Sequence, residues 1–257
     1  VAPPDFRRWA GEFFAAGGCG LSVIWPHKVA AAGFAHELTA RASRAGGANL
    51  LTRRGERVLG DNTDGTGLVR DLTRNLGLTL AGCRVLVLGA GGSARGIVGP
   101  LLQSELAQLQ IANRNPARAA ALVESFADRT QATVLSYGST GDVRATSVDL
   151  AGDLSLRVSV STPWGDAELH PAVKGAHHVT NLLAALAGAL AVEVPLDAAV
   201  AGIEAAEPPD RRMQMHRVAG DITVIDDSFN ATLDSVLGAL DALAAVDAPE
   251  RLAVLGP

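Results

Sequence analysis

The sequence predicts an α/β protein, and three observations support this fold class. The stretch CRVLVLGAGGSARGIVGPLL is an apolar run followed by a glycine-rich turn and a helical segment, and it leads into a second strand-like run, LQIANR. That order is typical of a βαβ unit. Helical and extended patterns alternate before this unit, whereas VRATSVDL and SLRVSVSTPW, beyond about Gln131, have the texture of antiparallel strands. We therefore expect a change of domain between residues 132 and 141.

The elements expected around the βαβ unit follow from apolar periodicity and from turn residues. The elements expected before the unit begin with a helix over 5–15, a strand over 20–24 and one long amphipathic helix through Ala30, Phe34, Leu38 and Ala42. The extended runs ANLLT and RVLG follow, joined by the turn RRGE. A further helix follows DNTDG, and Thr63 or Asp64 caps it. Directly after the βαβ unit a helix begins at Pro116.

The second half of the chain continues with further alternation. Its expected elements are the strands already quoted with AELH, a buried helix over 175–192, a helix ending before EPPDRR, the strands MQMHRV and DITVID, a helix over 230–246 and a final strand RLAVLG. The chain starts at Val1 without a methionine and stops just after that final run, so we expect both ends to be truncated.

Composition and charge narrow the classes of function. Of the 257 residues 48% are hydrophobic, which is enough for buried cores. The net charge of −5, without a run of like charges, argues against a nucleic-acid partner and a polybasic membrane surface, and no apolar run reaches the roughly 20 residues that span a bilayer. Cys19 and Cys83 are too few for a disulfide framework or a zinc site. These features favour a cytoplasmic protein with a small-molecule substrate and no metal, and they predict no particular oligomeric state.

The glycine-rich turn predicts a dinucleotide site of the Rossmann type. Gly89, Gly91 and Ala94 form G-x-G-x-x-A directly after a strand and at the start of a helix, where glycines let the backbone approach a pyrophosphate. The second strand ends in Asn113 and Arg114 rather than in the carboxylate that an NAD site usually carries, and a guanidinium suits a 2′-phosphate. We therefore favour NADP over NAD. The alternative is that Arg114 and its neighbour along the chain, Arg118, are ordinary solvated arginines.

Lys28 and Asp64 are the candidate catalytic pair. Lys28 follows a strand and a proline, and the loop GDNTDG offers Asp61 and Asp64 before a helix. Reduction of a carbonyl by a nicotinamide requires a proton donor beside the developing alkoxide, and a lysine held near a carboxylate can serve. Taken alone, Lys28 would more often be a surface residue of a helix and Asp64 an N-cap.

Five stretches occur in the order and spacing of one known family. GLSVIWPHK, AGGANLL, GDNTDGTGLVRDL, VLGAGGSARG and ANRNPARA resemble the shikimate dehydrogenase family over about residues 1–126. The resemblance implies NADP-dependent interconversion of shikimate and 3-dehydroshikimate. The roles it implies are catalysis for Lys28 and Asp64, substrate binding for Ser22, Asn49 and Asp64, and cofactor binding for Gly89, Ala90, Gly91, Gly92, Ser93, Ala94, Asn113, Arg114, Asn115 and Arg118. Ile24 departs from the family, which usually has a threonine there.

A second resemblance begins near Thr133 and continues to Pro257. STPWGDAELHPAVKGAHHVTNLLAALAGALA, PPDRRMQMHRV and TVIDDSFNATLDSV are similar to the Mur amide ligases, closest to the member that adds D-alanyl-D-alanine to the UDP-muramoyl tripeptide. It implies an ATP site with Asn181 near adenine and with Arg212 and Asp227 near ribose and phosphate. His177 matches the residue that this family usually has, whereas His178 occupies a position where the family usually has asparagine, and Arg211 one where it usually has glycine. Without the resemblance, Asn181 would be interpreted as a helix amide that forms a local hydrogen bond, and Asp227 as an acidic residue in a turn.

The two resemblances together predict a truncated composite. The expected domains are a substrate-binding α/β domain over 1–79, an incomplete Rossmann-like unit over 80–132, a Mur ligase central-domain segment over 133–209 and the start of its C-terminal domain over 210–257. The leading hypothesis is an NADP-dependent oxidoreductase of shikimate, impaired if the truncation matters. The alternatives are a remnant of an ATP- and Mg²⁺-dependent ligase, which lacks a G-x-x-x-x-G-K-[ST] phosphate loop here, and an inactive chain.

Overall fold

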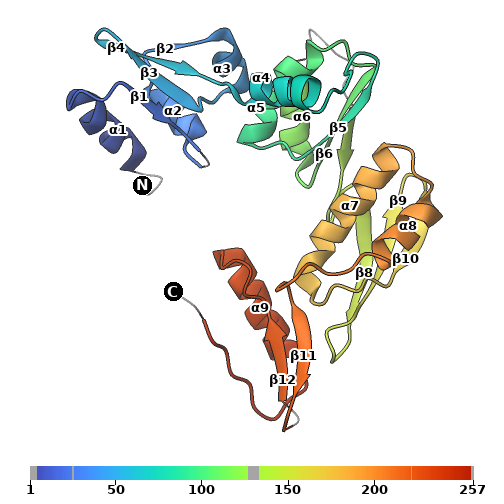
Figure 1. The fold of residues 1–257 in the computed structure, drawn as a ribbon. Helices are drawn as coiled ribbons and strands as arrows, with labels where there is room; N and C mark the ends of the chain where they lie inside the picture. Colours follow the sequence, from blue (N-terminus) through green and yellow to red (C-terminus); the bar gives the residue numbers. More distant parts are fainter. Residues whose placement is uncertain (1–4, 25, 127–132, 221, 256–257) are drawn as a thin grey trace. The chain divides into compact units, whose positions relative to one another are not determined.

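The structure, a computed structural model, describes residues 5–24, 26–126, 133–220 and 222–255 (Figure 1). The chain divides into two compact units, Val1–Val134 and Leu135–Pro257, and the strand β7 (Thr133–Ser136) spans the division. No helix in the described ranges is both long and apolar enough to cross a membrane.

The first unit begins with a four-stranded sheet of order β1-β3-β4-β2. Its strands are β1 (Gly20–Ser22), β2 (Glu37–Leu38), β3 (Leu50–Arg54) and β4 (Arg57–Asp61), and its helices are α1 (Phe6–Ala15), α2 (Lys28–Phe34) and α3 (Ala40–Ala45). β1 and β4 pair antiparallel to β3, and β2 pairs parallel to β4. α1 is amphipathic: Phe6, Ala10 and Phe14 lie one turn apart and are buried against Leu51 and Val58. The expected helix over 5–15 is therefore confirmed.

The single long helix expected through Ala42 is wrong. The chain leaves α2 at Ala35, which is extended, and Leu38 pairs with Gly60 in the parallel contact between β2 and β4. Thr39 then caps α3, because its hydroxyl accepts a hydrogen bond from the Ala42 amide (3.3 Å). Strand pairing gives Leu38 a tertiary partner that periodicity alone does not reveal. The expected strand over 20–24 is also shorter and ends at Ser22.

The βαβ unit is confirmed. It consists of β5 (Arg84–Leu88), α5 (Gly92–Leu102) and β6 (Gln108–Asn113), with β5 and β6 parallel, and α6 (Pro116–Glu124) follows. α4 (Asp64–Arg70) precedes it and continues into a π-helical turn, η2 (Asp71–Asn75). The core of this part holds Val98, Leu109, Ile111, Leu122 and Phe126.

The second unit starts with a three-stranded antiparallel sheet of order β10-β9-β8, as the alternating pattern predicts. Its elements are β8 (Arg144–Leu150), β9 (Leu156–Thr162), β10 (Gly165–Leu169), the 3₁₀ turn η3 (Ala176–His178), α7 (Val179–Ala191) and α8 (Leu196–Glu204). The helix expected over 175–192 thus starts as a 3₁₀ turn. It is buried on one face only: Leu186 and Leu190 are inaccessible, whereas Thr180 and Asn181 are exposed.

The last part of the second unit is an antiparallel hairpin followed by a helix. The elements are β11 (Gln214–Val218), β12 (Ile222–Asp226) and α9 (Leu233–Ala245), so the helix starts later than expected, after its cap Thr232. The final strand predicted from RLAVLG is wrong for the described residues 251–255. Leu252 and Val254 are 83% and 88% exposed, and an extended segment without a neighbouring strand has no ladder to join.

Candidate functional site

Three polar side chains from separate elements converge in the first unit. Lys28 is the first residue of α2, Asn49 directly precedes β3, and Asp64 is the first residue of α4. Lys28 Nζ donates to Asp64 Oδ2 at 2.6 Å, and Asn49 Nδ2 donates to Asp64 Oδ1 at 2.8 Å. Both carboxylate oxygens are therefore bound. We call these residues the Lys28–Asn49–Asp64 cluster.

The backbone around the cluster fixes Asn49 in place. Asn49 Oδ1 accepts from the Thr63 amide at 2.9 Å, and the Asn49 carbonyl accepts from the Val23 amide at 2.8 Å. The Lys28 carbonyl in turn accepts from the Ala48 amide at 2.8 Å. Val23, which directly follows β1, the turn before β3 and the start of α4 are thus bonded to one another. Such a framework holds the polar groups in place before any ligand arrives.

The cluster is partly shielded from solvent but remains accessible. The side chains of Lys28 and Asp64 are 15% and 22% exposed. An ammonium donor and a carboxylate acceptor that lie 2.6 Å apart can both hydrogen-bond to a single hydroxyl group, one as donor and the other as acceptor. Partial removal from water strengthens both hydrogen bonds. The arrangement is therefore suited to binding and orienting an alcohol.

Two neighbouring residues do not join the cluster. Ser22 is exposed in β1 opposite Leu50, and its hydroxyl makes no hydrogen bond with any residue that the structure describes. Ile24 is 73% exposed. Substrate binding by Ser22 stays a prediction.

Sequence reasoning missed the structural role of the residues between Asp61 and Asp64. Asn62 is 2% exposed, and its amide donates to the Gly47 carbonyl at 2.9 Å. Thr63, one of the two residues expected to cap α4, is its N-cap residue but makes no side-chain cap, because its hydroxyl accepts from Asn49 Nδ2 at 3.0 Å. The signal was the unbroken run of polar residues DNTD between two glycines, which is costly to bury unless each group has a partner.

Asp61 has a different partner from Asp64. Arg41 grips it with two nitrogens, of which Nε lies 2.7 Å from Oδ1, and Thr39 donates to the same oxygen. The Arg41 guanidinium is the main cause that lowers the pKa of the Asp61 carboxyl to about 2, against the opposing effect of burial. Asp61 therefore joins α3 to β4.

This pair predicts a pH dependence of stability. The folded pKa of Asp61 lies below its ordinary value of 3.8, so its contribution is complete above about pH 4 and is lost as the pH falls toward 2. Asp61→Asn should lower the free energy of unfolding at pH 7 by about 1–2 kcal/mol, allowing for partial solvent screening, and the difference should shrink below pH 4. Urea titrations at several pH values measure it, with Asp71→Asn in the exposed turn η2 as the control. A difference that persists unchanged to low pH would contradict this account.

The glycine-rich turn has the backbone that phosphate binding requires. Gly89 has φ +106°, a conformation that side-chain-bearing residues rarely adopt, and its amide donates to the Ala112 carbonyl at 2.7 Å. Gly91 is the N-cap of α5 and Gly92 its first residue, and a Cβ at either would meet nothing within 4 Å. Ala90 and Ala94 are buried, and no side chain caps the helix start. Several helix-start amides therefore remain for an anion.

The turn and the cluster lie on connected elements. Gly65, next to Asp64, packs so tightly on α5 that a Cβ there would lie 2.5 Å from the Gly96 carbonyl oxygen. Gly96 is four residues beyond Gly92, which is about 6 Å along a helix. α4 thus holds Asp64 within a short distance of the start of α5.

The segment after β6 combines fixed asparagines with free arginines. Asn113 is buried and its amide donates to the Asn115 carbonyl at 2.8 Å, while Asn115 Oδ1 caps α6 by accepting from the Arg118 amide at 3.1 Å. The side chains of Arg114 and Arg118 are exposed and pair with no described residue. The asparagines shape the turn, and the arginines remain available to an anion.

In the second unit, two of the three residues expected to bind a nucleotide, Arg212 and Asp227, lie close together at the open end of the β11–β12 hairpin. Asp227 Oδ1 accepts from the Met213 amide at 3.2 Å, and the Arg212 guanidinium carbon lies 4.2 Å from the centre of the Phe229 ring. Asn181 is exposed on α7, and no hydrogen bond or ion pair in the described region joins it to Arg212 or Asp227.

A histidine pair and a strained arginine border that end of the hairpin. Burial, then His177 and Arg212, lower the pKa of His178 to about 4, and burial lowers the pKa of His177 against the opposing charge of Asp227. His178 Nε2 is buried without a partner among the described residues. Arg211, where the resembled family has glycine, has φ +56°, which glycine adopts at less cost. No group of three or more His, Cys, Asp or Glu in the described ranges could hold a metal ion.

Comparisons with known proteins point to one family for much of the chain. The family model described as shikimate / quinate 5-dehydrogenase matches residues 71–140. The shikimate dehydrogenase (NADP(+)) of Dechloromonas aromatica is 47% identical over 158 residues, which cover 59% of this chain and 58% of that protein. The enzyme of the same name from Xylella fastidiosa is 39% identical over 197 residues, 70% of each chain. The chain spans about half of the first three relatives, between 48% and 58% of their length.

Solved structures give two kinds of neighbour. The crystal structure of an Ael1 enzyme from Pseudomonas putida matches with a TM-score of 0.50 and 38% identity, over 53% of this chain and 50% of that one. A crystal structure of MurF from Acinetobacter baumannii matches with a TM-score of 0.52 and 26% identity, over 63% of this chain and 38% of that one.

Proposed function

Because the chain belongs to the shikimate dehydrogenase family, we propose that it interconverts shikimate and 3-dehydroshikimate, with NADP as the hydride carrier. The observation that carries the proposal is the Lys28–Asn49–Asp64 cluster, in which an ammonium and an amide both bind one carboxylate. Because the chain spans about half of several relatives, the activity of those whole enzymes is a proposal for this chain.

The residues around the glycine-rich turn fit NADP. Gly89 has the required backbone, the space beside Gly91 and Gly92 is open, and α5 begins without a side-chain cap. We assign the pyrophosphate to this turn and the adenosine 2′-phosphate to Arg114 and Arg118, whose guanidinium groups are exposed. When bound by these residues, NADP would supply hydride transfer to and from the substrate carbon.

The cluster provides the polar part of the reaction. Lys28 Nζ donates a hydrogen bond to the reacting oxygen of the substrate, and Asp64 accepts one from it while the oxygen is a hydroxyl. When the ketone is reduced, Lys28 Nζ supplies the proton that the developing alkoxide takes up, and Asp64 keeps the ammonium aimed at that oxygen. Asn49 orients Asp64 by donating to its Oδ1. To bind a further substrate hydroxyl, the Asn49 amide exchanges its hydrogen bond to the Thr63 hydroxyl for one to the substrate.

A nucleotide titration tests the cofactor assignment. The full chain should bind NADPH more tightly than NADH, and Arg114→Ala with Arg118→Ala should weaken NADPH binding by about tenfold to a hundredfold with little change for NADH. NADPH fluorescence measures the affinity, and Arg74→Ala, an exposed arginine on η2, is the control. Unchanged NADPH affinity in the double variant would remove the basis of the cofactor choice.

A second candidate rests on the second unit. The likeness to MurF and the proximity of Arg212 to Phe229 support the proposal that Leu135–Pro257 descends from a Mur ligase nucleotide site and that the chain is a composite. The fit to ATP and Mg²⁺ is poor, since the sequence has no G-x-x-x-x-G-K-[ST] loop to hold phosphates. ATP binding, measured by calorimetric titration, that an Arg212→Ala variant loses would favour this candidate.

We also propose that the protein is located in the cytoplasm, a reducing compartment. Cys19 and Cys83 are both free and exposed, which suits such a compartment.

A further inference from the structure

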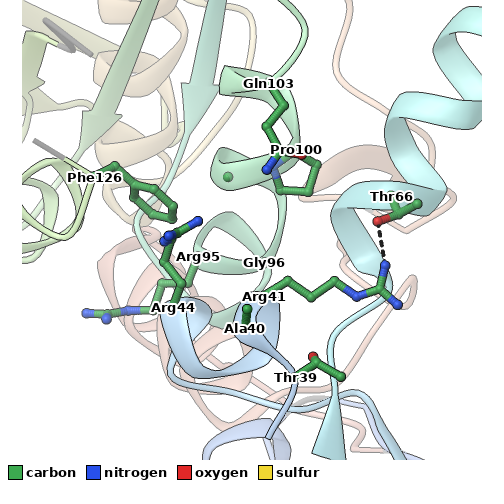
Figure 2. Close-up of a pocket in the computed structure, with 11 residues that line it drawn as sticks. Thr39, Ala40, Arg41, Arg44, Thr66, Arg95, Gly96, Pro100, Gln103 and Phe126 are labelled. Atoms are coloured by element: carbon green, nitrogen blue, oxygen red, sulfur yellow. Dashed lines mark hydrogen bonds between the residues drawn. The ribbon is translucent and has the colours of Figure 1, made fainter. Parts of the chain in front are cut away.

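A cavity of about 400 Å³ opens between α3, α4 and α5 in the first unit (Figure 2). Its lining consists of Thr39, Ala40, Arg41, Arg44, Thr66, Arg95, Gly96, Gly99, Pro100, Gln103 and Phe126. Three of these residues are arginines, and no acidic residue of the described part of the chain lines the cavity. We call it the arginine pocket.

The three arginines are not equivalent. Arg41 is already neutralised by Asp61, and its Nη1 donates to the Thr66 hydroxyl at 2.9 Å. Figure 2 shows it reaching toward Thr66, whereas Arg44 and Arg95 lie at the side of Phe126. Arg44 and Arg95 are half-buried, and neither guanidinium has a hydrogen bond or ion pair with any residue that the structure describes. Two positive groups are thus partly removed from water without an acceptor, which is unfavourable unless a ligand supplies one.

Interaction with the helix dipole stabilises only one of these two positive charges. Arg44 lies in the last turn of α3, where the helix dipole favours a cation. Arg95 lies near the start of α5, the positive end, where a cation is disfavoured. Arg95 therefore has a cost in the protein alone that a bound anion would offset.

We propose that the arginine pocket binds a phosphate-bearing small molecule, with Arg44 and Arg95 as the phosphate ligands. Two free guanidinium charges match a phosphate monoester, which carries about −1.5 to −2 charges at neutral pH, better than they match a single carboxylate. The cavity volume falls within the usual range of small-molecule sites, roughly 300–1,000 Å³. Pro100 and Phe126 offer apolar surface for the remainder of the molecule.

The arginine pocket differs from both parts of the proposed dehydrogenase site. The cofactor arginines, Arg114 and Arg118, do not line it. Thr66, which does, is two residues from Asp64 on α4, and residues at that spacing point to different sides of a helix. The inference therefore stands or falls separately from the proposed activity.

The test is a phosphate titration of the full chain. Inorganic phosphate and pyrophosphate are titrated at constant ionic strength against chloride, without and with saturating NADPH to occupy the glycine-rich turn, and ³¹P line widths and the melting temperature are the readouts. In the presence of NADPH we expect saturable binding that Arg44→Gln and Arg95→Gln each weaken about tenfold or more and that the double variant loses. Arg74→Gln, an exposed arginine outside the pocket, and the Arg114→Ala, Arg118→Ala variant should bind as the unaltered chain does.

Gln103→Glu gives a second test that keeps both arginines. A carboxylate at this position of the pocket should compete with phosphate, so binding should fall and the melting temperature without phosphate should rise. The proposal is overturned if the chain binds neither probe, if the double arginine variant binds unchanged, or if Arg114→Ala with Arg118→Ala abolishes binding. Tighter binding of citrate than of either phosphate probe would also overturn it, because a polycarboxylate would then be the better ligand.

Discussion

Replacing Lys28 by alanine is expected to lower shikimate-dependent NADPH formation by about two to four orders of magnitude. The substitution removes the only side chain of the Lys28–Asn49–Asp64 cluster that can donate a proton to an alkoxide, and it leaves Asp64 without its cation. NADPH affinity should hardly change, since the cofactor residues lie on other elements. Steady-state absorbance of NADPH measures the rate, and the fluorescence titration measures the affinity.

The chain offers a matched control for this substitution. Lys174 is the only other lysine of the sequence, and it pairs with Asp153 in the second unit. Lys174→Ala should leave the rate unchanged. An equal rate in Lys28→Ala would show that the assigned proton transfer is wrong, and an unaltered chain that binds NADPH without any turnover would contradict the proposed activity while leaving the cofactor assignment standing.

Gly65→Ala is expected to destabilise the first unit by about 1–3 kcal/mol or more. The new Cβ would lie 2.5 Å from the Gly96 carbonyl oxygen and 2.6 Å from Pro100 Cγ, so α4 must move away from α5. Asp64 moves with α4, and turnover should fall together with stability. Urea denaturation measures the free energy of unfolding, and the same preparation gives the rate.

Gly67→Ala is the control for this prediction, because it adds the same methyl group to the same helix. Gly67 is exposed, and a Cβ there would meet nothing within 4 Å. Alanine should therefore stabilise the helix by about 0.5–1 kcal/mol. If both substitutions had the same effect, the close approach of α4 to α5 would not be present in the protein.

Local chemistry could be predicted from the sequence, whereas tertiary partners could not. The turn around Gly89 and the βαβ unit depend on neighbours in sequence, so their pattern is visible in the residues themselves. Leu38 fits a helix by spacing and joins a strand only because Gly60 leaves room beside it. RLAVLG has the composition of a strand, but composition does not supply the neighbour that a strand requires.

The same limit applied to the polar residues. The chemistry of a proton donor and its carboxylate is enough to link Lys28 with Asp64 from the sequence alone. The pairing of Asp61 with Arg41 left no trace in spacing, because the two residues meet only through the packing of α3 on the sheet. The arginine pocket was not expected for the same reason, since Arg44 and Arg95 belong to different helices.

The half-buried imidazole of His178, whose Nε2 is inaccessible, makes Leu135–Pro257 sensitive to mild acid. A denatured chain takes up a proton at this ring near pH 6.5, whereas the folded chain does so only near pH 4, so acidification between these values pulls the equilibrium toward denaturation. The ion pair between Asp61 and Arg41 is lost only at lower pH, as Asp61 becomes protonated below about pH 4. Purification and storage at or above neutral pH therefore keep this contribution to the stability of the unit Leu135–Pro257.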